Sequence, residues 1–103
     1  MKTLPVDVIA YKRTPEFTVN TVPVGLLNSH NTKAGVWGKI VVLEGEVRYR
    51  ILEPEFEEVR LDVHTYGVVE PTVRHEVALS PDARFYVEFH RAAPAHPALT
   101  NPS

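Results

Sequence analysis

The chain has 103 residues, of which 44% are hydrophobic and 23% are charged, as expected for one globular domain with a single core. Eleven basic and thirteen acidic side chains give a net charge of −2, so there is no basic excess for binding nucleic-acid phosphates. Cysteine is absent, which excludes disulfides, zinc ribbons and thiol nucleophiles. No apolar stretch approaches the roughly 18 residues of a membrane span, and the N-terminus lacks a secretion-signal core. We therefore expect no membrane partner and a cytoplasmic location.

The first half of the chain shows three short apolar runs. Residues 6–11 form one, and residues 22–27 form another. Pro23 would confine that second run to a sheet edge or a bulge, because proline cannot donate to a hydrogen-bond ladder. Residues 38–43 are apolar on both faces and rich in β-branched side chains, which is typical of a central strand.

A turn signal at Glu44-Gly45 joins residues 38–43 to residues 46–51. In the second run apolar and charged side chains alternate strictly, as in a strand with one buried face. The pattern predicts a β-hairpin centred near Gly45.

The second half of the chain continues the strand pattern. Alternating runs occupy residues 59–63, 73–79 and 84–90, and no long helical periodicity is present. Seven or eight short strands therefore fill a domain of residues 1–90, which predicts an antiparallel sandwich or barrel. Residues 91–103 are rich in alanine and proline and are predicted to form a weakly ordered tail.

Two histidines are predicted to lie on the core face. His75 shares one face of its strand with Val73, Val77 and Leu79, because side chains alternate along a strand. His30 ends an apolar stripe if the segment before it is extended. Two inward imidazoles suggest a metal pocket. The alternative is a pair of partly buried histidines that hydrogen-bond to backbone or hydroxyl groups, with their charge suppressed by desolvation.

Two segments resemble a known family. Residues 30–40, with Trp37-Gly38-Lys39 after the run from His30, and residues 69–75 are similar to two signatures of the TehB/YeaR-like cupin family, which includes the N-terminal domain of the tellurite-resistance protein TehB. The resemblance covers roughly residues 11–90. It implies a cupin-like double-stranded β-helix, an antiparallel barrel or jelly roll, that is dimeric and holds a metal or small ligand inside.

The resemblance does not imply methyltransferase activity. The catalytic domain of TehB needs a glycine-rich nucleotide loop and a long α/β region, and neither occurs in these 103 residues. Whether the chain is an enzyme therefore stays open.

The cupin metal pattern is only half present. His30 and His75 match two of its four ligand positions, and the other two positions hold residues that are not ligands. Glu70, in the loop before His75, is the preferred third ligand. Glu88 and His90 are less favoured, because they share the strand face opposite the apolar one. Imidazole ligands suit zinc best, with iron or nickel as alternatives.

Lys33 and Lys39 bracket Trp37 in the first signature. Either lysine could balance the charge of an anionic ligand, such as an oxyanion, beside the indole ring. The alternative is that both lysines are solvated and Trp37 fills the core.

The sequence supports three functional hypotheses. The first is a stand-alone cupin-like protein that binds a divalent metal, and a small anion as well, in a stress response related to tellurite resistance. The second is a metal-dependent enzyme of the dioxygenase or isomerase type that uses two histidines and a carboxylate. The third is a metal-free dimeric scaffold. A homodimer is expected in each case, because exposed strand edges in a small barrel can pair between two copies.

Overall fold

The structure is a computed structural model that describes residues 1–28 and 31–93. These residues contain seven β-strands and one 3₁₀ helix. In chain order the elements are β1 (Val8–Arg13), η1 (Val24–Leu27), β2 (Trp37–Glu44), β3 (Val47–Ile51), β4 (Glu57–Leu61), β5 (Gly67–Val69), β6 (His75–Leu79) and β7 (Arg84–Ala92). The predicted all-β class is confirmed. Within the described ranges, no helix has the length and apolar character needed to cross a membrane.

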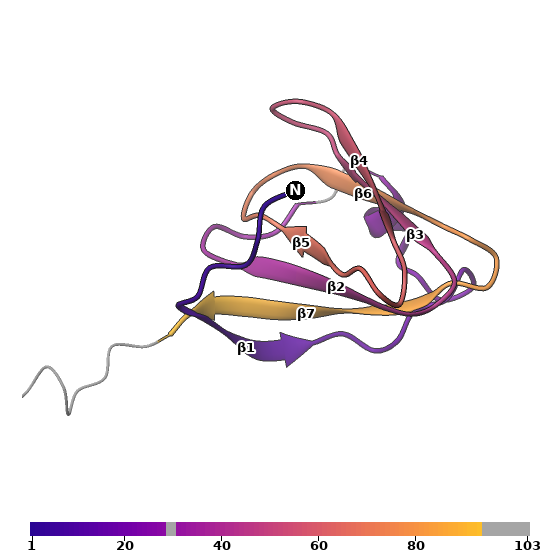
Figure 1. Ribbon diagram of the computed structural model, residues 1–103, viewed down its shortest axis with the longest axis horizontal. Helices are drawn as coiled ribbons and strands as arrows, with labels where there is room; N and C mark the ends of the chain where they lie inside the picture. The colour runs from indigo at the N-terminus through magenta and orange to yellow at the C-terminus, as the bar shows by residue number, and fades with distance from the viewer. Residues whose placement is uncertain (29–30, 94–103) are drawn as a thin grey trace, which may run out of the picture.

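The strands form two antiparallel sheets that face each other (Figure 1). The larger sheet has the order β1-β7-β2-β5, and the smaller sheet has the order β4-β3-β6. Neither β1 nor β5, the edge strands of the larger sheet, pairs with a strand of the smaller one in the described part of the chain. The predicted closed barrel is therefore wrong, because the ladders stop at two open edges on each sheet.

The core lies between the sheets and follows the alternation of side chains along each strand. In β3, Val47, Tyr49 and Ile51 point inward and are buried, as their spacing predicts. In β7, Phe85 and Val87 are likewise buried and inward. Burying each such side chain stabilises the fold by about 1.5–3 kcal/mol.

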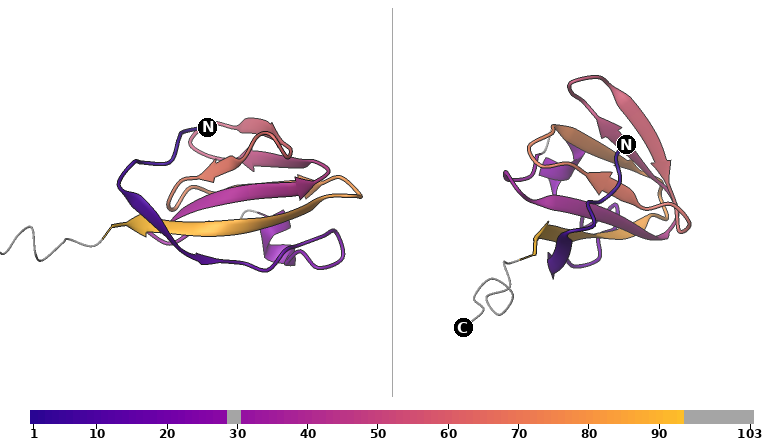
Figure 2. Two further views of the ribbon diagram at one scale, coloured as in Figure 1. Left: turned by 60° about the horizontal axis from the view of Figure 1, so that its bottom comes forward. Right: turned by 60° about the vertical axis from the view of Figure 1, so that its left-hand side comes forward.

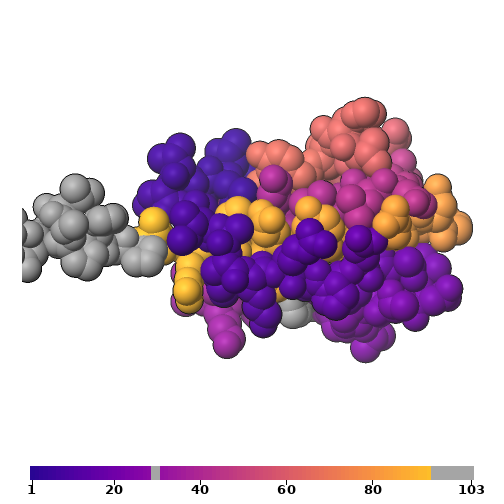
Figure 3. Space-filling view, turned by 90° about the horizontal axis from the view of Figure 1, so that it is seen from below, coloured from indigo at the N-terminus to yellow at the C-terminus, as the bar shows by residue number. Residues whose placement is uncertain are grey.

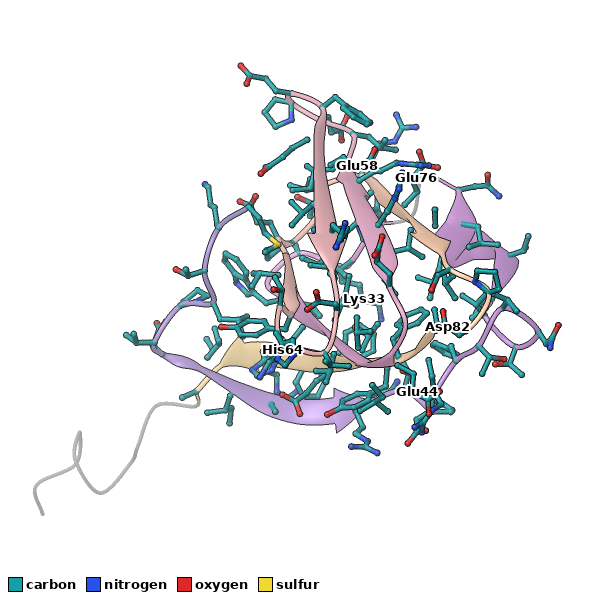
Figure 4. The ribbon with its side chains drawn as sticks, turned by 45° about the vertical axis from the view of Figure 1, so that its right-hand side comes forward. Lys33, Glu44, Glu58, His64, Glu76 and Asp82 are labelled. Atoms are coloured by element: carbon teal, nitrogen blue, oxygen red, sulfur yellow. The ribbon has the colours of Figure 1, made fainter. Side chains whose placement is uncertain are left out.

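The chain reverses at Gly45, but the strands on either side do not pair. β2 belongs to the larger sheet and β3 to the smaller one, so the predicted hairpin is wrong. The turn instead packs against the β6–β7 turn, where the Ser80 hydroxyl accepts a hydrogen bond from the Glu46 N–H (2.9 Å) and donates one to Asp82 (2.7 Å). Gly45 has φ +68°, and a Cβ there would lie 2.7 Å from Asp82 Oδ1 and Ser80 Oγ. Both its conformation and the close approach therefore require glycine. Figure 4 shows Glu44 and Asp82 near each other at this end of the molecule.

The apolar run at residues 22–27 is not a strand. Its last four residues form η1, in which the Leu26 N–H donates to the Pro23 carbonyl (3.0 Å). Proline has a fixed φ, here −60°, and no N–H, which suits the start of a helical turn better than a strand ladder. η1 packs beside β6 (Figure 2). A short helical turn thus replaces the strand that the sequence predicts for residues 22–27.

The other predicted strands form with boundaries within two residues of the sequence prediction, and β5 is an additional strand. β5 occupies only Gly67–Val69, which is too short to show an alternating pattern in the sequence. β7 continues through Ala92, which pairs with Val8, and the Ala93 N–H donates to the Asp7 carbonyl (2.9 Å). Residues 94–103, the rest of the predicted tail, lie outside the described residues.

The chain stays against β7 after β1 ends. The Thr14 N–H donates to the Val87 carbonyl (2.9 Å), and Phe17 forms an isolated antiparallel bridge with Phe85. Figure 3 shows β1 and this following segment lying across β7 on the underside of the molecule. These backbone bonds place Phe17 at the edge of the space between the sheets.

Candidate functional site

A pocket of about 240 Å³ lies between the two sheets. Its wall is almost entirely apolar and is built from β2, β6, β7, η1 and the segment between β1 and η1. Pro23 and Gly25 line it and are exposed, so the pocket reaches the surface beside η1. The apolar side chains in the wall include Phe17, Leu26, Ile40, Val77, Phe85 and Phe89.

Strand alternation provides the floor of the pocket. Ile40 in β2 and Val87 in β7 face inward and oppose each other in the strand register. Gly38 lies two residues before Ile40 on the same inward face of β2, and a Cβ added there would lie 3.1 Å from the Val69 Cβ. The close approach of β2 and β5 thus depends on a residue without a side chain.

Phe17 and Leu26 form the cover of the pocket. The Phe17 ring meets the Phe85 ring edge-to-face, with centroids 5.7 Å apart, and Leu26 is presented by η1. Neither position follows from the sequence, because Phe17 lies in a segment without regular structure and the run of residues 22–27 predicts a strand where Leu26 lies in η1. Their apolar character in a loop was the only available signal.

The polar groups in the pocket wall are already hydrogen-bonded. The Thr14 hydroxyl donates to the Pro15 carbonyl (2.8 Å) and accepts from the Val87 N–H (3.0 Å). The Thr32 hydroxyl donates to the Val36 carbonyl (2.9 Å). Among the described residues that line the pocket there is no lysine, arginine, aspartate or glutamate. The wall therefore favours an uncharged ligand.

Among the described residues that line the pocket, His75 is the one with a titratable side chain. It is 3% exposed, on the core face where the sequence placed it, and its Nδ1 lies 3.1 Å from the Val73 carbonyl. Its ring meets the Tyr49 ring edge-to-face at a centroid distance of 5.7 Å. Burial, together with the negative charges of Glu70 and Glu57, raises the pKa of the Tyr49 hydroxyl above its usual value. Tyr49 is thus held neutral beside the pocket.

The predicted third metal ligand does not lie with His75. The Glu70 carboxylate is 3.3 Å from the Lys2 ammonium and lines a different hollow, which it shares with Glu53 and Glu57. That hollow lies by the β3–β4 loop and does not include His75. The loop that delivers His75 thus carries Glu70 away from the pocket.

Glu88 and His90 lie on the outer face of the larger sheet, as strand parity indicated. They bond to each other, with 2.8 Å between Glu88 Oε1 and His90 Nε2, and they alternate with the inward Val87 and Phe89. His90 is buried, and its Nδ1 has no hydrogen-bond partner among the described atoms. His30 lies outside the described residues, so its place in the site stays a prediction.

Of the three residues predicted to bind an anion, Trp37 and Lys39 share the outer face of β2, and Lys33 lies in the segment before it. Lys33 is exposed and lines a surface hollow with Tyr11. Trp37 and Lys39 face outward on β2, opposite in parity to the inward Ile40, and only Lys39 lines a hollow there. None of the three lines the pocket between the sheets.

Comparison with known proteins gives a family match. Residues 12–87 match the TehB-like domain. Two relatives, from Haemophilus influenzae strains 10810 and ATCC 51907 / DSM 11121 / KW20 / Rd, are 34% and 33% identical over 89 residues. Each is named "Probable S-adenosyl-L-methionine-dependent methyltransferase TehB". The match covers 82% of this chain but 31% of each relative, so the chain spans about a third of their length.

Two solved structures share the fold. A crystal structure of a protein from Escherichia coli strain K12 superposes with a TM-score of 0.82 at 23% identity, covering 91% of this chain and 100% of that one. The crystal structure of TehB from Haemophilus influenzae superposes with a TM-score of 0.78 at 28% identity, covering 95% of this chain and 36% of that one. The same fold therefore occurs as a whole small chain and as part of a longer one.

These findings correct the predicted metal-binding function. The relatives are named as methyltransferases, and residues 1–28 and 31–93 contain no group of three histidine, cysteine, aspartate or glutamate side chains that could hold a metal ion. The choice of zinc, iron or nickel stays a prediction, but the described residues bring no such group of ligands together. The physical reason is the strand geometry, which puts His75 inside, Glu88 and His90 outside, and Glu70 at another edge.

Proposed function

The chain belongs to the TehB-like family, and we propose that its domain binds a compact, uncharged, largely apolar molecule in the pocket between its two sheets. The observation that supports this proposal is the wall itself, in which phenylalanine and aliphatic side chains surround the space and, among the described residues, no lysine, arginine, aspartate or glutamate takes part. For scale, an engineered apolar cavity of about 150 Å³ is enough to hold benzene. The 240 Å³ here suits a single substituted ring or a short branched chain.

Burial of apolar surface is the driving force for such a ligand, at roughly 25 cal/mol per Å² removed from water. A charged ligand would lose its hydration without gaining a partner, because the wall hydroxyls of Thr14 and Thr32 already bond to the backbone. The pocket therefore selects by size and by absence of charge.

Anisole, phenol and benzoate, which share a ring and differ in polarity, test this selectivity. We expect anisole to shift the methyl resonances of Ile40, Val77 and Val87 in an NMR titration, and benzoate to leave them in place. Equal shifts of these methyl groups by benzoate and anisole would contradict an apolar site.

A matched pair of variants locates the binding. Val59 and Val77 both flank Tyr49 in the smaller sheet, one on β4 and one on β6, but only Val77 lines the pocket. Val77→Phe should fill the space and weaken anisole binding by about tenfold or more, whereas Val59→Phe should leave it within about twofold. If both variants bind anisole as the unchanged chain does, the ligand sits elsewhere.

We further propose that the ligand is an acceptor or product of methyl transfer, because the curated relatives that carry this domain are named as methyltransferases. Methylation of a hydroxyl removes its hydrogen-bond donor. A pocket whose own polar groups already have hydrogen-bond partners should therefore prefer the methylated form. Anisole should therefore bind about tenfold more tightly than phenol, since an unpaired buried hydroxyl costs about 1–3 kcal/mol. Stronger binding of phenol would reject the product form of the ligand.

The remaining expectations stay predictions. They are the jelly-roll connectivity of the cupin fold, the homodimer, the lack of a nucleic-acid or membrane partner, the cytoplasmic location and a role in tellurite resistance.

A further inference from the structure

Lys39 occupies an unusual position for a lysine on the outer face of the larger sheet. It is half-buried, and its ammonium lies 4.6 Å from the centroid of the Tyr66 ring. No carboxylate lies within ion-pair distance of it in residues 1–28 and 31–93. A cation that is partly removed from water and balanced only by a ring face retains most of its attraction for an anion.

Lys39 opens onto a surface hollow of about 190 Å³. Tyr86 of β7 forms one side of the hollow, and the β4–β5 loop forms the other with Val63, His64 and Tyr66. Figure 4 labels His64 on this loop. The hollow thus combines one ammonium, two phenol rings and aliphatic surface.

Arg13, a second cation without a carboxylate partner among the described residues, stacks on the Tyr86 ring but does not itself line the hollow. Its guanidinium carbon lies 4.3 Å from the centroid of the Tyr86 ring, and no carboxylate pairs with it among the described ion pairs. Tyr86 therefore stands between Arg13 and the hollow. Each cation lies over a tyrosine ring that lines the hollow, Lys39 over Tyr66 of the β4–β5 loop and Arg13 over Tyr86 of β7.

The nearby carboxylates are turned to other partners. Glu88 lies opposite both Lys39 and Arg13 in the strand register, yet its Oε1 is 2.8 Å from His90 Nε2. Asp62 lines the hollow, and its Oδ1 accepts from the His64 N–H (2.8 Å). Both acids reduce the positive potential, but neither pairs with a cation of the hollow.

We propose that this hollow binds a small organic anion, an apolar ring or branched chain that carries one carboxylate. The carboxylate would bond to the Lys39 ammonium, and the apolar body would lie between the Tyr66 and Tyr86 rings and Val63. An inorganic oxyanion fits less well, because it gains nothing from the rings and aliphatic surface. The site is separate from the pocket between the sheets and does not depend on the ligand proposed for it.

Benzoate is the probe, followed through the amide resonances of Val41, Tyr66 and Tyr86 in a titration of the full chain. Lys39→Met keeps an unbranched stem and removes the charge, and it should weaken benzoate binding by about tenfold. Lys33→Met is the matched control, because Lys33 lines a different hollow and should leave benzoate binding unchanged. Glu88→Gln should strengthen binding about twofold or more by removing a nearby negative charge.

Two neutral or inorganic probes complete the test. Benzyl alcohol and inorganic phosphate should each bind at least about tenfold more weakly than benzoate, as measured from the shifts of the same amide resonances. Benzyl alcohol that binds as tightly as benzoate, phosphate that binds more tightly, or a Lys39→Met variant that keeps full affinity while its thermal unfolding is unchanged would each overturn the proposal.

Discussion

The two ends of the space between the sheets differ in how they are filled. At the end near the Gly45 and Ser80 turns, the core side chains Val42, Val47 and Leu61 are at most 4% exposed, and none of them lines the pocket between the sheets. At the other end, His75 and Val77 border an opening of about 240 Å³. Strands and paired turns close the first end, while a loop and one four-residue helical turn cover the second. Stability and binding are thus assigned to different ends of one interior.

The largest expected effect comes from truncating a leucine at each end. Leu61→Ala should lower the free energy of unfolding by about 3 kcal/mol, because a fully buried leucine leaves a cavity that the packed end cannot close. Leu26→Ala should cost roughly 1 kcal/mol, since Leu26 is half-buried beside open space. Urea denaturation measures both.

This pair is decisive for the comparison. Similar losses for Leu61→Ala and Leu26→Ala would show that the pocket end is packed as tightly as the other, and the contrast between the two ends would fail. Far-ultraviolet circular dichroism of both variants checks that each keeps its sheet content.

A smaller effect is expected from adding one methyl group to a glycine at each end. A Cβ on Gly67 would lie 2.6 Å from Leu61 Cδ1 and 3.4 Å from Ile40, so Gly67→Ala should destabilise by about 1–3 kcal/mol through overpacking. At Gly25 an added Cβ would meet nothing within 4 Å and φ is not positive. Gly25→Ala should therefore be neutral, or stabilising by about 0.4–1 kcal/mol through the unfolded state.

Thermal unfolding of the two glycine variants provides the measurement. Because Gly67 and Gly25 receive the same methyl group, the difference between their melting temperatures reports local packing alone. A Gly67→Ala variant that melts with the unchanged chain would mean that the Leu61 side chain can move aside, and the packed end would be looser than its contacts indicate.

The strands could be predicted from the sequence, but their partners could not. The alternation of Val47, Tyr49 and Ile51 fixed a buried face for β3, and the structure confirms it. The turn at Gly45 was also correct in place. Turn chemistry, however, sets where the chain reverses and not whether the next strand joins the same sheet. Here the Glu46 N–H bonds to the Ser80 hydroxyl, and β3 pairs with β4 and β6 in the other sheet.

The pocket was less predictable than the fold. His75 was placed on the core side because it lies within a regular strand, where parity is reliable. The positions of Phe17 and Leu26 were not found, because Phe17 lies in a segment without regular structure and Leu26 lies in η1, where the sequence predicts a strand. Glu70 shows the same limit, since its closeness to His75 in sequence did not bring its carboxylate into the pocket.

The smallest expected effect lies at Tyr49, on the boundary between the two ends, and appears as pH dependence. Burial raises the pKa of its hydroxyl above the value of about 10 that it has in the unfolded chain, so the folded state favours the neutral form. Its contribution to stability is therefore complete below about pH 10 and is lost as pH rises further, by at most about 1.4 kcal/mol per pH unit. Tyr49→Phe, which keeps the ring against His75, should flatten the decline in unfolding free energy above pH 10 that the unchanged chain shows in urea denaturation. An equally steep alkaline decline in Tyr49→Phe would place the titrating group elsewhere, and it would show that Tyr49 is solvated from the pocket side rather than sealed within the packed end.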